Sequence, residues 1–307
     1  MATRPGRNYY TSRMNSRLPL TLVLPRLSQA RVPLTRSIEV VNEHGVSSSI
    51  SIPAERALTI YVDKRELVTL MTLGAEPELL TLGYLRNQRL IETLADIESV
   101  TVDWEVGAAA VRTRSGIDRI EERTSRRVVT TGCGQGSVFG ALLDDIDAVR
   151  LPASSITQSD LYAIVNCIRL MDSTYKTAGS VHGCALFRGR EMLVFVEDVG
   201  RHNAMDTISG WAWMQGLQLG QEDAPGASLA FYTTGRLTSE MVIKSAQMGV
   251  AIVISRSGMT QMGHEVAQRL GLCAIGRALN KHFLCYAGAH RLLMQAGIAG
   301  PPLRVVA

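Results

Sequence analysis

No stretch of this 307-residue sequence approaches the roughly 20 consecutive apolar residues that a helix needs to cross a bilayer. The apolar segment at residues 18–24 is too short and too closely bounded by Pro19 and Pro25. Hydrophobic residues nevertheless make up 46% of the chain, which is enough for a sizeable core. The sequence therefore predicts a globular protein that is not a membrane protein.

Acidic residues are absent from residues 1–36, which carry seven arginines. Because the formal net charge of the whole chain is +4, the remaining residues sum to −3. This mildly acidic body argues against nucleic acid as a partner, since nucleic-acid-binding proteins cluster positive charge on a folded face. We interpret residues 1–36 as a basic, disordered tail, with a transit peptide as the alternative for the same composition.

Cysteine is scarce, and no two cysteines have the spacing of a metal finger. The five are Cys133, Cys167, Cys184, Cys273 and Cys285. In a chain without a secretory signal they predict no disulfide framework, and a reducing compartment such as the cytoplasm fits best. Cys167, Cys273 and Cys285 lie in apolar segments and are expected in the core. His182 and Cys184 are two residues apart, but the His-x-Glu and Pro-Cys-x-x-Cys motifs of zinc deaminases are missing, so we expect no metal site.

The order of apolar segments predicts two structured parts. Residues 37–150 form a β-rich α+β part, because residues 37–72 and 100–113 alternate as strands do and residues 76–85 have helical spacing. Residues 151–307 form an α/β domain, in which helices alternate with strands. The expected helices are residues 159–172, 203–214, 239–248 and 261–270, and the expected strands are residues 192–196, 229–232, 250–254 and 272–275. This alternation predicts a three-layer α/β sandwich with a largely parallel or mixed sheet.

Cys133 lies in a loop with three glycines that follows a strand-like run, within residues 126–137. Such a loop leaves a thiol accessible, and nearby arginines or backbone N–H groups favour the thiolate, which is the nucleophilic form. A glycine-rich turn around a core cysteine is equally consistent with these residues. The pattern alone leaves both interpretations open.

Four loops of the expected α/β domain combine glycine or hydroxyl residues with an arginine, and three of them precede a helix. They are residues 197–206, 233–240, 255–260 and 276–277. In an open α/β sheet such loops gather beyond the carboxyl ends of the strands. Free N–H groups at helix N-termini and guanidinium groups bind phosphate, although each loop alone is also compatible with ordinary helix capping. Several loops at one edge favour a phosphate-rich ligand.

Five motifs in this order resemble one family, the formate dehydrogenase accessory sulfurtransferase (FdhD-type) family. They are Thr-Gly-Cys-Gly at 131–134, Ala-Gly-Ser-Val-His-Gly at 178–183, Glu-Asp-Val-Gly-Arg-His-Asn-Ala at 197–204, Gly-Arg-x-x-Ser-Glu at 235–240 and Ser-Arg-Ser at 255–257. The resemblance covers roughly residues 37–292. It implies a fold similar to a cytidine deaminase without the zinc, and an enzyme that relays sulfur from a cysteine desulfurase to the molybdenum bis(molybdopterin guanine dinucleotide) cofactor of a formate dehydrogenase.

The resemblance also implies which residues act. Cys133 matches the cysteine that carries the persulfide. The residues of this chain that match segments near the family's cofactor pocket are Asp198, Gly200, Arg201, His202, Asn203, Gly235, Arg236, Ser239, Ser255, Arg256, Ser257, Gly276, Arg277, Ala278, Leu279, Asn280, Lys281 and His282. We expect Arg201, Arg236 and Arg256 to hold phosphates, and His202 or Asp198 to order the pocket or recognise a base. The expected partners are the desulfurase, the formate dehydrogenase catalytic subunit and a second copy of the chain.

Two departures from the family pattern keep alternatives open. Gly136 stands where the family has a second cysteine, so the motif holds no resolving thiol, although one cysteine suffices to carry a persulfide. Residues 276–283 differ from the usual Gly-Phe-Ala-Arg-Gly-x-Arg-Phe but remain basic. The alternative function is a non-catalytic chaperone that delivers the finished cofactor, and a nucleotide hydrolase or deaminase would require a metal or an activated water.

Overall fold

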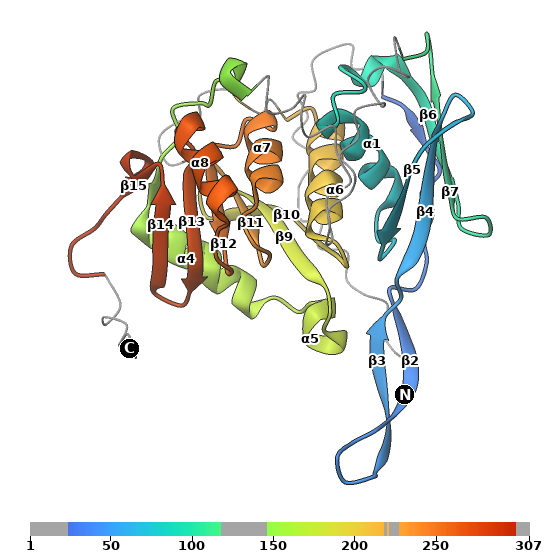
Figure 1. Cartoon of the computed structure of the whole chain (residues 1–307), viewed down its shortest axis with the longest axis horizontal. Helices are drawn as coiled ribbons and strands as arrows, with labels where there is room; N and C mark the ends of the chain where they lie inside the picture. The colour runs from blue at the N-terminus through green and yellow to red at the C-terminus, as the bar shows by residue number, and fades with distance from the viewer. Residues whose placement is uncertain (1–23, 118–145, 218–219, 221–226, 299–307) are drawn as a thin grey trace.

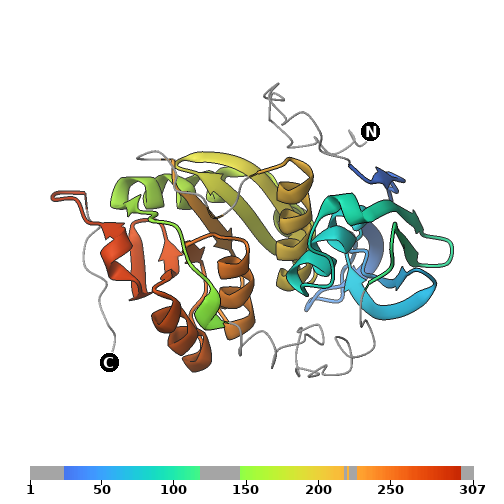
Figure 2. The same ribbon diagram turned by 90° about the horizontal axis from the view of Figure 1, so that it is seen from above.

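The structure, a computed structural model, describes residues 24–117, 146–217, 220 and 227–298. These residues form a smaller β-rich part at the N-terminal end and a larger α/β part, which meet along two helices (Figures 1 and 2). No helix in the described residues is long and apolar enough to cross a membrane.

The N-terminal part is a five-stranded sheet covered by one helix. The strands are β1 (Arg26–Leu27), β4 (Arg56–Val62), β5 (Arg65–Thr72), β6 (Ile97–Asp103) and β7 (Ala108–Thr113), in the order β1-β6-β7-β4-β5. Leu58, Ile60 and Val62 alternate along β4 and are buried, as one face of a half-covered strand requires. The helix α1 (Pro77–Asn87) packs on this face and completes the core.

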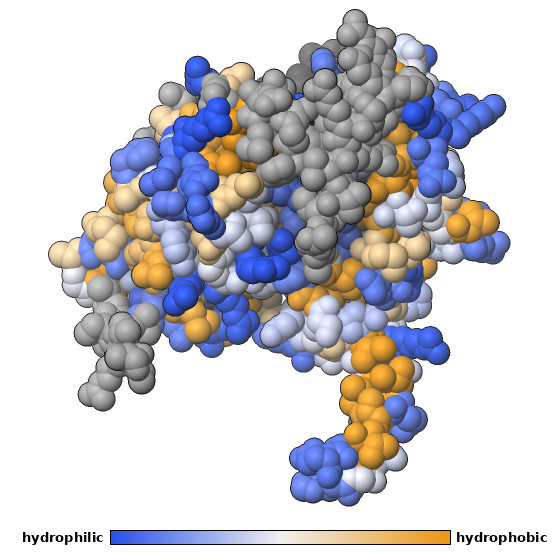
Figure 3. Space-filling model, viewed as in Figure 1, coloured by the Kyte–Doolittle hydropathy of each residue, from blue (hydrophilic) through white to orange (hydrophobic). Residues whose placement is uncertain are grey.

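A β-hairpin extends away from the body of the molecule (Figure 1). It consists of β2 (Thr35–Val41) and β3 (Ser47–Pro53), paired in antiparallel register with Ile38 opposite Ile50. Apolar side chains form a continuous stripe along it in Figure 3. Val41, Val46 and Ile50 are among the exposed large hydrophobic residues.

The α/β part is a six-stranded mixed sheet between two helical layers. The strands are β9 (His182–Arg188), β10 (Glu191–Asp198), β11 (Leu229–Thr233), β12 (Ile252–Ser255), β13 (Cys273–Leu279) and β14 (His282–Ala287), in the order β10-β9-β11-β12-β13-β14. Strands β11, β12 and β13 are parallel, and the other pairs are antiparallel. The helix α4 (Gln158–Leu170) covers one face, while α6 (Arg201–Met214), α7 (Ser239–Gln247) and α8 (Gln261–Leu270) cover the other. The remaining elements are short: α5 (Thr174–Ala178), the 3₁₀ turns η1 (Leu94–Asp96), η2 (Ile146–Ala148) and η3 (Ala289–Arg291), and the paired strands β8 (Ile156–Thr157) and β15 (Leu292–Leu293).

The two parts meet where the backbones of α1 and α6 touch. A methyl group on Gly83 of α1 would lie 1.6 Å from the backbone oxygen of Asp206. A methyl group on Gly210 of α6 would lie 2.0 Å from the backbone oxygen of Leu79. The two glycines therefore set the close approach of the helices, because any side chain at either position would push the helices apart.

Most of the predicted elements are confirmed, and three expectations need correction. The predicted tail ends too late, because residues 26–27 already form β1 and residues 35–36 belong to β2. The strands β9 and β14 are additional to the predicted set. Residues 276–283, predicted as a cofactor loop, are mostly the paired strands β13 and β14. The Cys133 loop lies outside the described residues, as do residues 1–23 of the predicted tail.

Candidate functional site: a basic edge of the mixed sheet

The motifs of the α/β part gather at one edge of the sheet, as their positions after strands predict. Strands β11 and β12 both end there, with Thr233 beside Ser255 in parallel register. Strand β9 begins at the same edge and β10 ends there, because antiparallel pairing sets His182 opposite Asp198 and Cys184 opposite Thr233. The loops 199–200, 234–238 and 256–260 therefore lie side by side, each leading into a helix.

Hydrogen bonds between neighbouring loops hold this edge in place. The Thr234 hydroxyl accepts a bond from the Gly183 N–H at 3.1 Å. The Ser255 hydroxyl donates to the Gly235 carbonyl at 2.6 Å and accepts from the Ser257 N–H at 2.9 Å. The Ser255 hydroxyl thus joins the second and third loops. A backbone fixed in this way presents its attached side chains from a rigid position.

Positive charge concentrates on the fixed loops. Arg236 and Arg256 are exposed, and each follows the end of a strand. Arg201, only 4% exposed, passes directly beside Gly235, where an added methyl group would lie 2.4 Å from its Cδ. Burial lowers the pKa of His182, and the charges of Arg201 and Arg236 lower it further. The two nearby guanidinium groups make this end of the edge electropositive and suited to an anion.

The β13–β14 hairpin extends the same edge. The Arg277 N–H donates to the Ser257 carbonyl at 2.7 Å, which ties the hairpin to the third loop. Gly276 is required by close packing, because a methyl group there would lie 2.6 Å from the Tyr286 ring. Arg277, Leu279, Asn280 and Lys281 are exposed, His282 is partly buried and Ala278 is buried. The hairpin therefore adds the cations Arg277 and Lys281 to the surface, whereas Ala278 has a packing role.

Asp198 and Asn203 are bonded to the protein itself. The Asp198 carboxylate accepts hydrogen bonds from Thr72, Leu73, Gly200 and Asn203. The Asn203 amide also donates to the Met71 carbonyl at 2.7 Å. Burial raises the pKa of Asp198, and the four donors oppose that rise. These two residues join the start of α6 to the end of β5. The motif at residues 197–204 therefore positions the site through contacts inside the protein.

A buried charged cluster lies behind the edge, and the sequence reasoning missed it. The Lys244 ammonium lies 2.9 Å from Asp206 and 3.6 Å from Glu240, and Glu240 lies 3.2 Å from His202. Burial lowers the pKa of Lys244, but the two carboxylates outweigh burial and raise it above its usual value. The sequence signal was the Glu240–Lys244 spacing of four residues on a helix, which brings both side chains to one face. Helix capping does not explain Glu240, since no side chain caps α7 at Thr238.

The other predicted capping interactions differ between the helices. The helix α8 is capped as expected, because the Thr260 hydroxyl accepts from the Gly263 N–H. Asn203 lies within α6, which begins at Arg201 after Gly200, and therefore does not cap this helix. Gly200 precedes α6 with its N–H bonded to the Asp198 carboxylate, whereas Thr238 provides no side-chain cap for α7, which begins at Ser239. The first N–H groups of α7 are therefore donors for an anion.

The four cysteines within the described residues are free thiols of different character. Burial raises the pKa of Cys184 to about 12 and also raises that of Cys167. A hydrogen bond with Cys273 lowers the pKa of Cys285 to about 7 and raises that of Cys273. Among the described residues, Cys285 is therefore the thiol with the largest thiolate fraction at neutral pH. The same residues contain no group of three or more His, Cys, Asp or Glu side chains that could hold a metal ion.

These pKa directions predict the order of alkylation among the described cysteines. We expect iodoacetamide to modify Cys285 before Cys167, Cys184 and Cys273, with a rate that rises as the pH passes through about 7, because the thiolate is the reactive form. Peptide mass spectrometry over time measures each rate. Faster labelling of the buried Cys184 than of Cys285 would contradict this ordering.

The fold and this edge define a class of protein: a two-part α/β protein with a basic, loop-lined rim that suits an anionic ligand. The sequence model of the FdhD/NarQ family matches residues 53–293, and the chain belongs to this family.

Similar proteins agree with this assignment. The chain is 28% identical over 259 residues to a protein of Geobacillus kaustophilus (strain HTA426) named "Sulfur carrier protein FdhD", covering 82% of this chain and 94% of the relative. A protein of the same name from Bacillus subtilis (strain 168) is 28% identical over 240 residues, covering 78% and 88%. A solved structure, "Crystal structure of a putative formate dehydrogenase accessory protein from Desulfotalea psychrophila", superposes with a TM-score of 0.65, at 22% identity, covering 85% of this chain and 100% of that one. At this identity the superposition establishes the fold.

Proposed function

We propose that this protein is a sulfurtransferase that passes a persulfide sulfur from a cysteine desulfurase to the molybdenum bis(molybdopterin guanine dinucleotide) cofactor, for insertion into a formate dehydrogenase. The observation that supports cofactor binding is the basic edge, where Arg236 and Arg256 extend from hydrogen-bonded loops beside helix N-termini. The support for sulfur transfer is Cys133 in its glycine motif and the name shared by the similar proteins.

Loading of Cys133 is a thiol exchange that needs no outside oxidant. The Cys133 thiolate attacks the outer sulfur of the desulfurase persulfide, a new sulfur–sulfur bond forms, and the desulfurase thiolate leaves. The loaded protein would then bind the cofactor as its substrate. Transfer of the outer sulfur would break the sulfur–sulfur bond and leave Cys133 as a thiolate, and the two electrons that convert the sulfane sulfur to sulfide would come from the substrate's reduced molybdenum, which is oxidised by two electrons. A shielded carrier is needed because a solvent sulfide cannot be delivered selectively.

The basic edge would bind the phosphates of the cofactor. Arg236 and Arg256 offer guanidinium groups that pair with phosphate oxygens, and the N–H groups at the start of α7 add donors. Arg201, buried beside Gly235, contributes positive charge from beneath and is a positioning residue in this scheme. We also propose that the α/β part corresponds to a zinc-free deaminase scaffold and that the chain acts as a homodimer in a reducing compartment.

Arginine replacements at the basic edge test whether this edge binds the cofactor's phosphates, with GDP as the probe. We expect Arg236→Gln and Arg256→Gln each to weaken GDP binding roughly tenfold or more, because a hydrogen bond to a charged group contributes about 1.5–3 kcal/mol. Isothermal titration calorimetry at fixed ionic strength measures the affinity. The matched control is Arg112→Gln on β7, which removes the same charge from an exposed position of the other sheet. Equal losses in all three variants would argue against a phosphate site at the edge.

The pKa of the His182 imidazole also reports GDP binding at the basic edge. Since burial and the charges of Arg201 and Arg236 lower that pKa, bound phosphate should offset the positive charge and raise it. It follows that GDP should bind more tightly as the pH falls through the His182 pKa. Imidazole resonances followed by NMR over pH, with and without GDP, measure the shift. An unchanged His182 pKa at saturating GDP would place the nucleotide elsewhere.

A second candidate function is a non-catalytic chaperone that binds and delivers the finished cofactor. Gly136 favours it, because this residue stands where the family has a second cysteine. The two functions differ in their need for Cys133. The variant Cys133→Ala should abolish maturation of formate dehydrogenase if the protein carries sulfur, and should leave cofactor delivery largely intact if it is a chaperone.

A further inference from the structure

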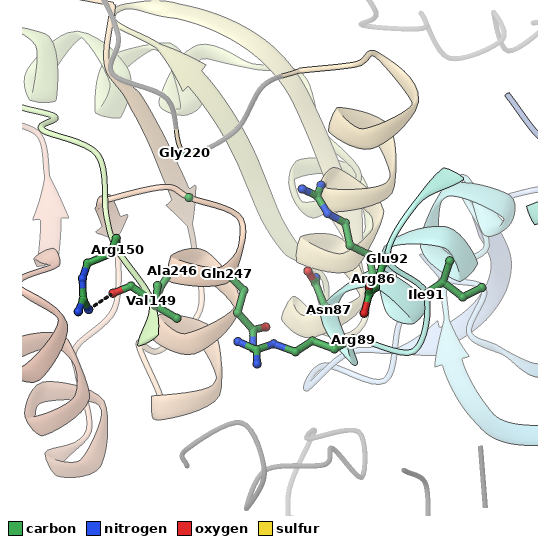
Figure 4. Close-up of a pocket in the computed structure, with 11 residues that line it drawn as sticks. Arg86, Asn87, Arg89, Ile91, Glu92, Val149, Arg150, Gly220, Ala246 and Gln247 are labelled. Atoms are coloured by element: carbon green, nitrogen blue, oxygen red, sulfur yellow. Dashed lines mark hydrogen bonds between the residues drawn. The ribbon is translucent and has the colours of Figure 1, made fainter. Parts of the chain in front are cut away.

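Two cysteines lie next to each other on neighbouring strands of the mixed sheet. Cys273 begins β13 and Cys285 lies within β14, and both pack in the hydrophobic cluster on the face that α4 covers. The opposite face is covered by α7, whose last two residues line the pocket of about 570 Å³ that Figure 4 shows. The cysteine pair is therefore separate from that pocket.

Strand pairing sets the two cysteine side chains diagonally across from one another. Cys285 is opposite Ile275, which lies two residues after Cys273 on the same face of β13. Side chains in such diagonal positions are within reach of each other. The two thiols hydrogen-bond to one another, and both are free thiols in this structure. The pairing therefore places two unbonded sulfur atoms in contact.

The strands can approach closely enough for a bond between these sulfur atoms. Diagonal neighbours have Cα atoms roughly 7–8 Å apart, whereas a disulfide holds its Cα atoms about 5.5–6 Å apart, so the strands must close by about 2 Å. The pairing register shifts between Ala274 and Ile275, where β14 contains an extra residue. Strand β14 is also the outermost strand (Figure 1), and β13 is its one partner among the described strands. An edge strand with a bulge beside the pair can move without breaking a second ladder.

The two thiols differ in exposure and acidity. Cys273 is 0% exposed, whereas Cys285 is only partly buried. The hydrogen bond with Cys273 lowers the pKa of Cys285 to about 7. The same bond and burial raise the pKa of Cys273, against the positive charge of Arg291. A dissolved oxidant therefore meets Cys285 largely as a thiolate, and a partly exposed thiolate beside a second thiol is the arrangement of redox-sensing cysteines.

We propose that Cys285 and Cys273 form a reversible redox site, at which a hydroperoxide oxidises Cys285 and Cys273 then closes a disulfide. With hydrogen peroxide, the Cys285 thiolate attacks one oxygen, the oxygen–oxygen bond breaks, hydroxide leaves, and Cys285 becomes a sulfenic acid. The Cys273 sulfur then attacks the Cys285 sulfur, the sulfur–oxygen bond breaks, and the Cys273 proton leaves with the hydroxide as water. The two thiols lose two electrons in total, which reduce the peroxide to two molecules of water.

This site goes beyond the proposed function, because its chemistry does not use Cys133. Closure of the disulfide removes the Cys285 thiolate, and exchange with a dithiol reductant restores both thiols. Disulfides that form in reducing compartments are usually transient and catalytic or redox-sensing. The site would thus record exposure of the protein to peroxide and be reset by cellular dithiols.

The test exposes the reduced full chain to hydrogen peroxide, blocks the remaining thiols with iodoacetamide and maps tryptic peptides without reductant. Cleavage after arginine and lysine separates Cys273, Cys285 and Cys167 into residues 270–277, 282–291 and 151–169. We expect a product with the summed mass of the first two peptides less two hydrogen atoms, which dithiothreitol returns to the separate peptides. Cys285 should lose its free thiol roughly tenfold or more faster than Cys167, which is also partly buried but has a raised pKa.

Three variants make the result specific. Cys167→Ser is the matched control and should leave the linked product unchanged. Cys273→Ala should abolish the link and leave Cys285 as a sulfenic acid that dimedone traps. If Cys273→Ala does not fold, Cys285→Ser replaces it and should protect Cys273 from peroxide, because peroxide reaches the buried thiol only through Cys285.

Three results would overturn the proposal. One is a link from Cys285 to Cys167 or Cys133 in place of Cys273, and another is oxidation of Cys285 to sulfinic or sulfonic acid without a link. The third is loss of the Cys285 thiol no faster than that of Cys167. GDP binding and sulfur loading of Cys133 are measured on the reduced protein, so a failure here leaves the proposed function untouched.

Discussion

Replacing Lys244 with alanine is expected to destabilise the protein by about 3–5 kcal/mol. The ammonium group is fully buried and lies 2.9 Å from Asp206 and 3.6 Å from Glu240. Its removal leaves two carboxylates in the core without their cation, and an unpaired buried charge is far more costly than an exposed one. The Asn87 amide, 2.6 Å from Asp206, cannot neutralise it. Urea unfolding followed by circular dichroism measures the change.

Two further variants make the Lys244 result specific. Lys281→Ala removes the same charge from the exposed β13–β14 turn and should change stability by no more than about 0.5 kcal/mol. Lys244→Met combined with Asp206→Asn removes both members of the closest pair and should recover part of the lost stability, because fewer charges remain uncompensated. Equal unfolding midpoints for Lys244→Ala and the parent protein would show that the cluster does not stabilise the fold.

Alanine at Gly83 is expected to destabilise the protein by roughly 3 kcal/mol, at the upper end for overpacked sites. Helix propensity alone argues the other way, since alanine is better than glycine in a helix by about 1 kcal/mol. The clash decides the sign, because the new methyl group would lie 1.6 Å from the Asp206 oxygen and 2.8 Å from the Gly210 nitrogen. Backbone atoms cannot move aside as a side chain can, so α1 and α6 must separate.

Gly258→Ala is the matched control for Gly83→Ala. The nearest atom to a methyl group there is the Tyr286 hydroxyl at 3.9 Å, an ordinary contact distance. We expect a change within about 0.5 kcal/mol. A Gly83→Ala protein as stable as the parent would mean that the helices do not touch through their backbones at this point.

Local sequence patterns predicted most of the fold because its main elements are defined by neighbouring residues. The apolar runs at 229–233 and 252–255 are fully buried strands, as short runs between turn signals indicate. The β13–β14 turn also had a local signal, since asparagine is common at positive φ and Asn280 has a φ of 54°. Strand β1 had none: its two residues are ordered by pairing with β6, about 70 positions later.

The candidate site was predictable in its outline but not in the role of each residue. The alternation of strands and helices places Arg236 and Arg256 at one edge, because parallel strands end together. The role of Asp198 depends on the Thr72 hydroxyl and the Leu73 N–H, 126 and 125 residues away in the sequence. Contacts at such separations follow from tertiary packing, and no local motif encodes them.

The measurement that tests the sulfur-carrier function most directly is mass spectrometry of the protein after incubation with a cysteine desulfurase and cysteine, without reductant. We predict an added sulfur atom on the peptide that contains Cys133, removed by later treatment with dithiothreitol and absent in Cys133→Ala. Cys285→Ser is the matched control, because its lowered pKa makes Cys285 the competing acceptor among the described thiols. An added sulfur on Cys285 alone, or an unmodified Cys133 in a protein that still binds GDP, would contradict the carrier function and favour the chaperone.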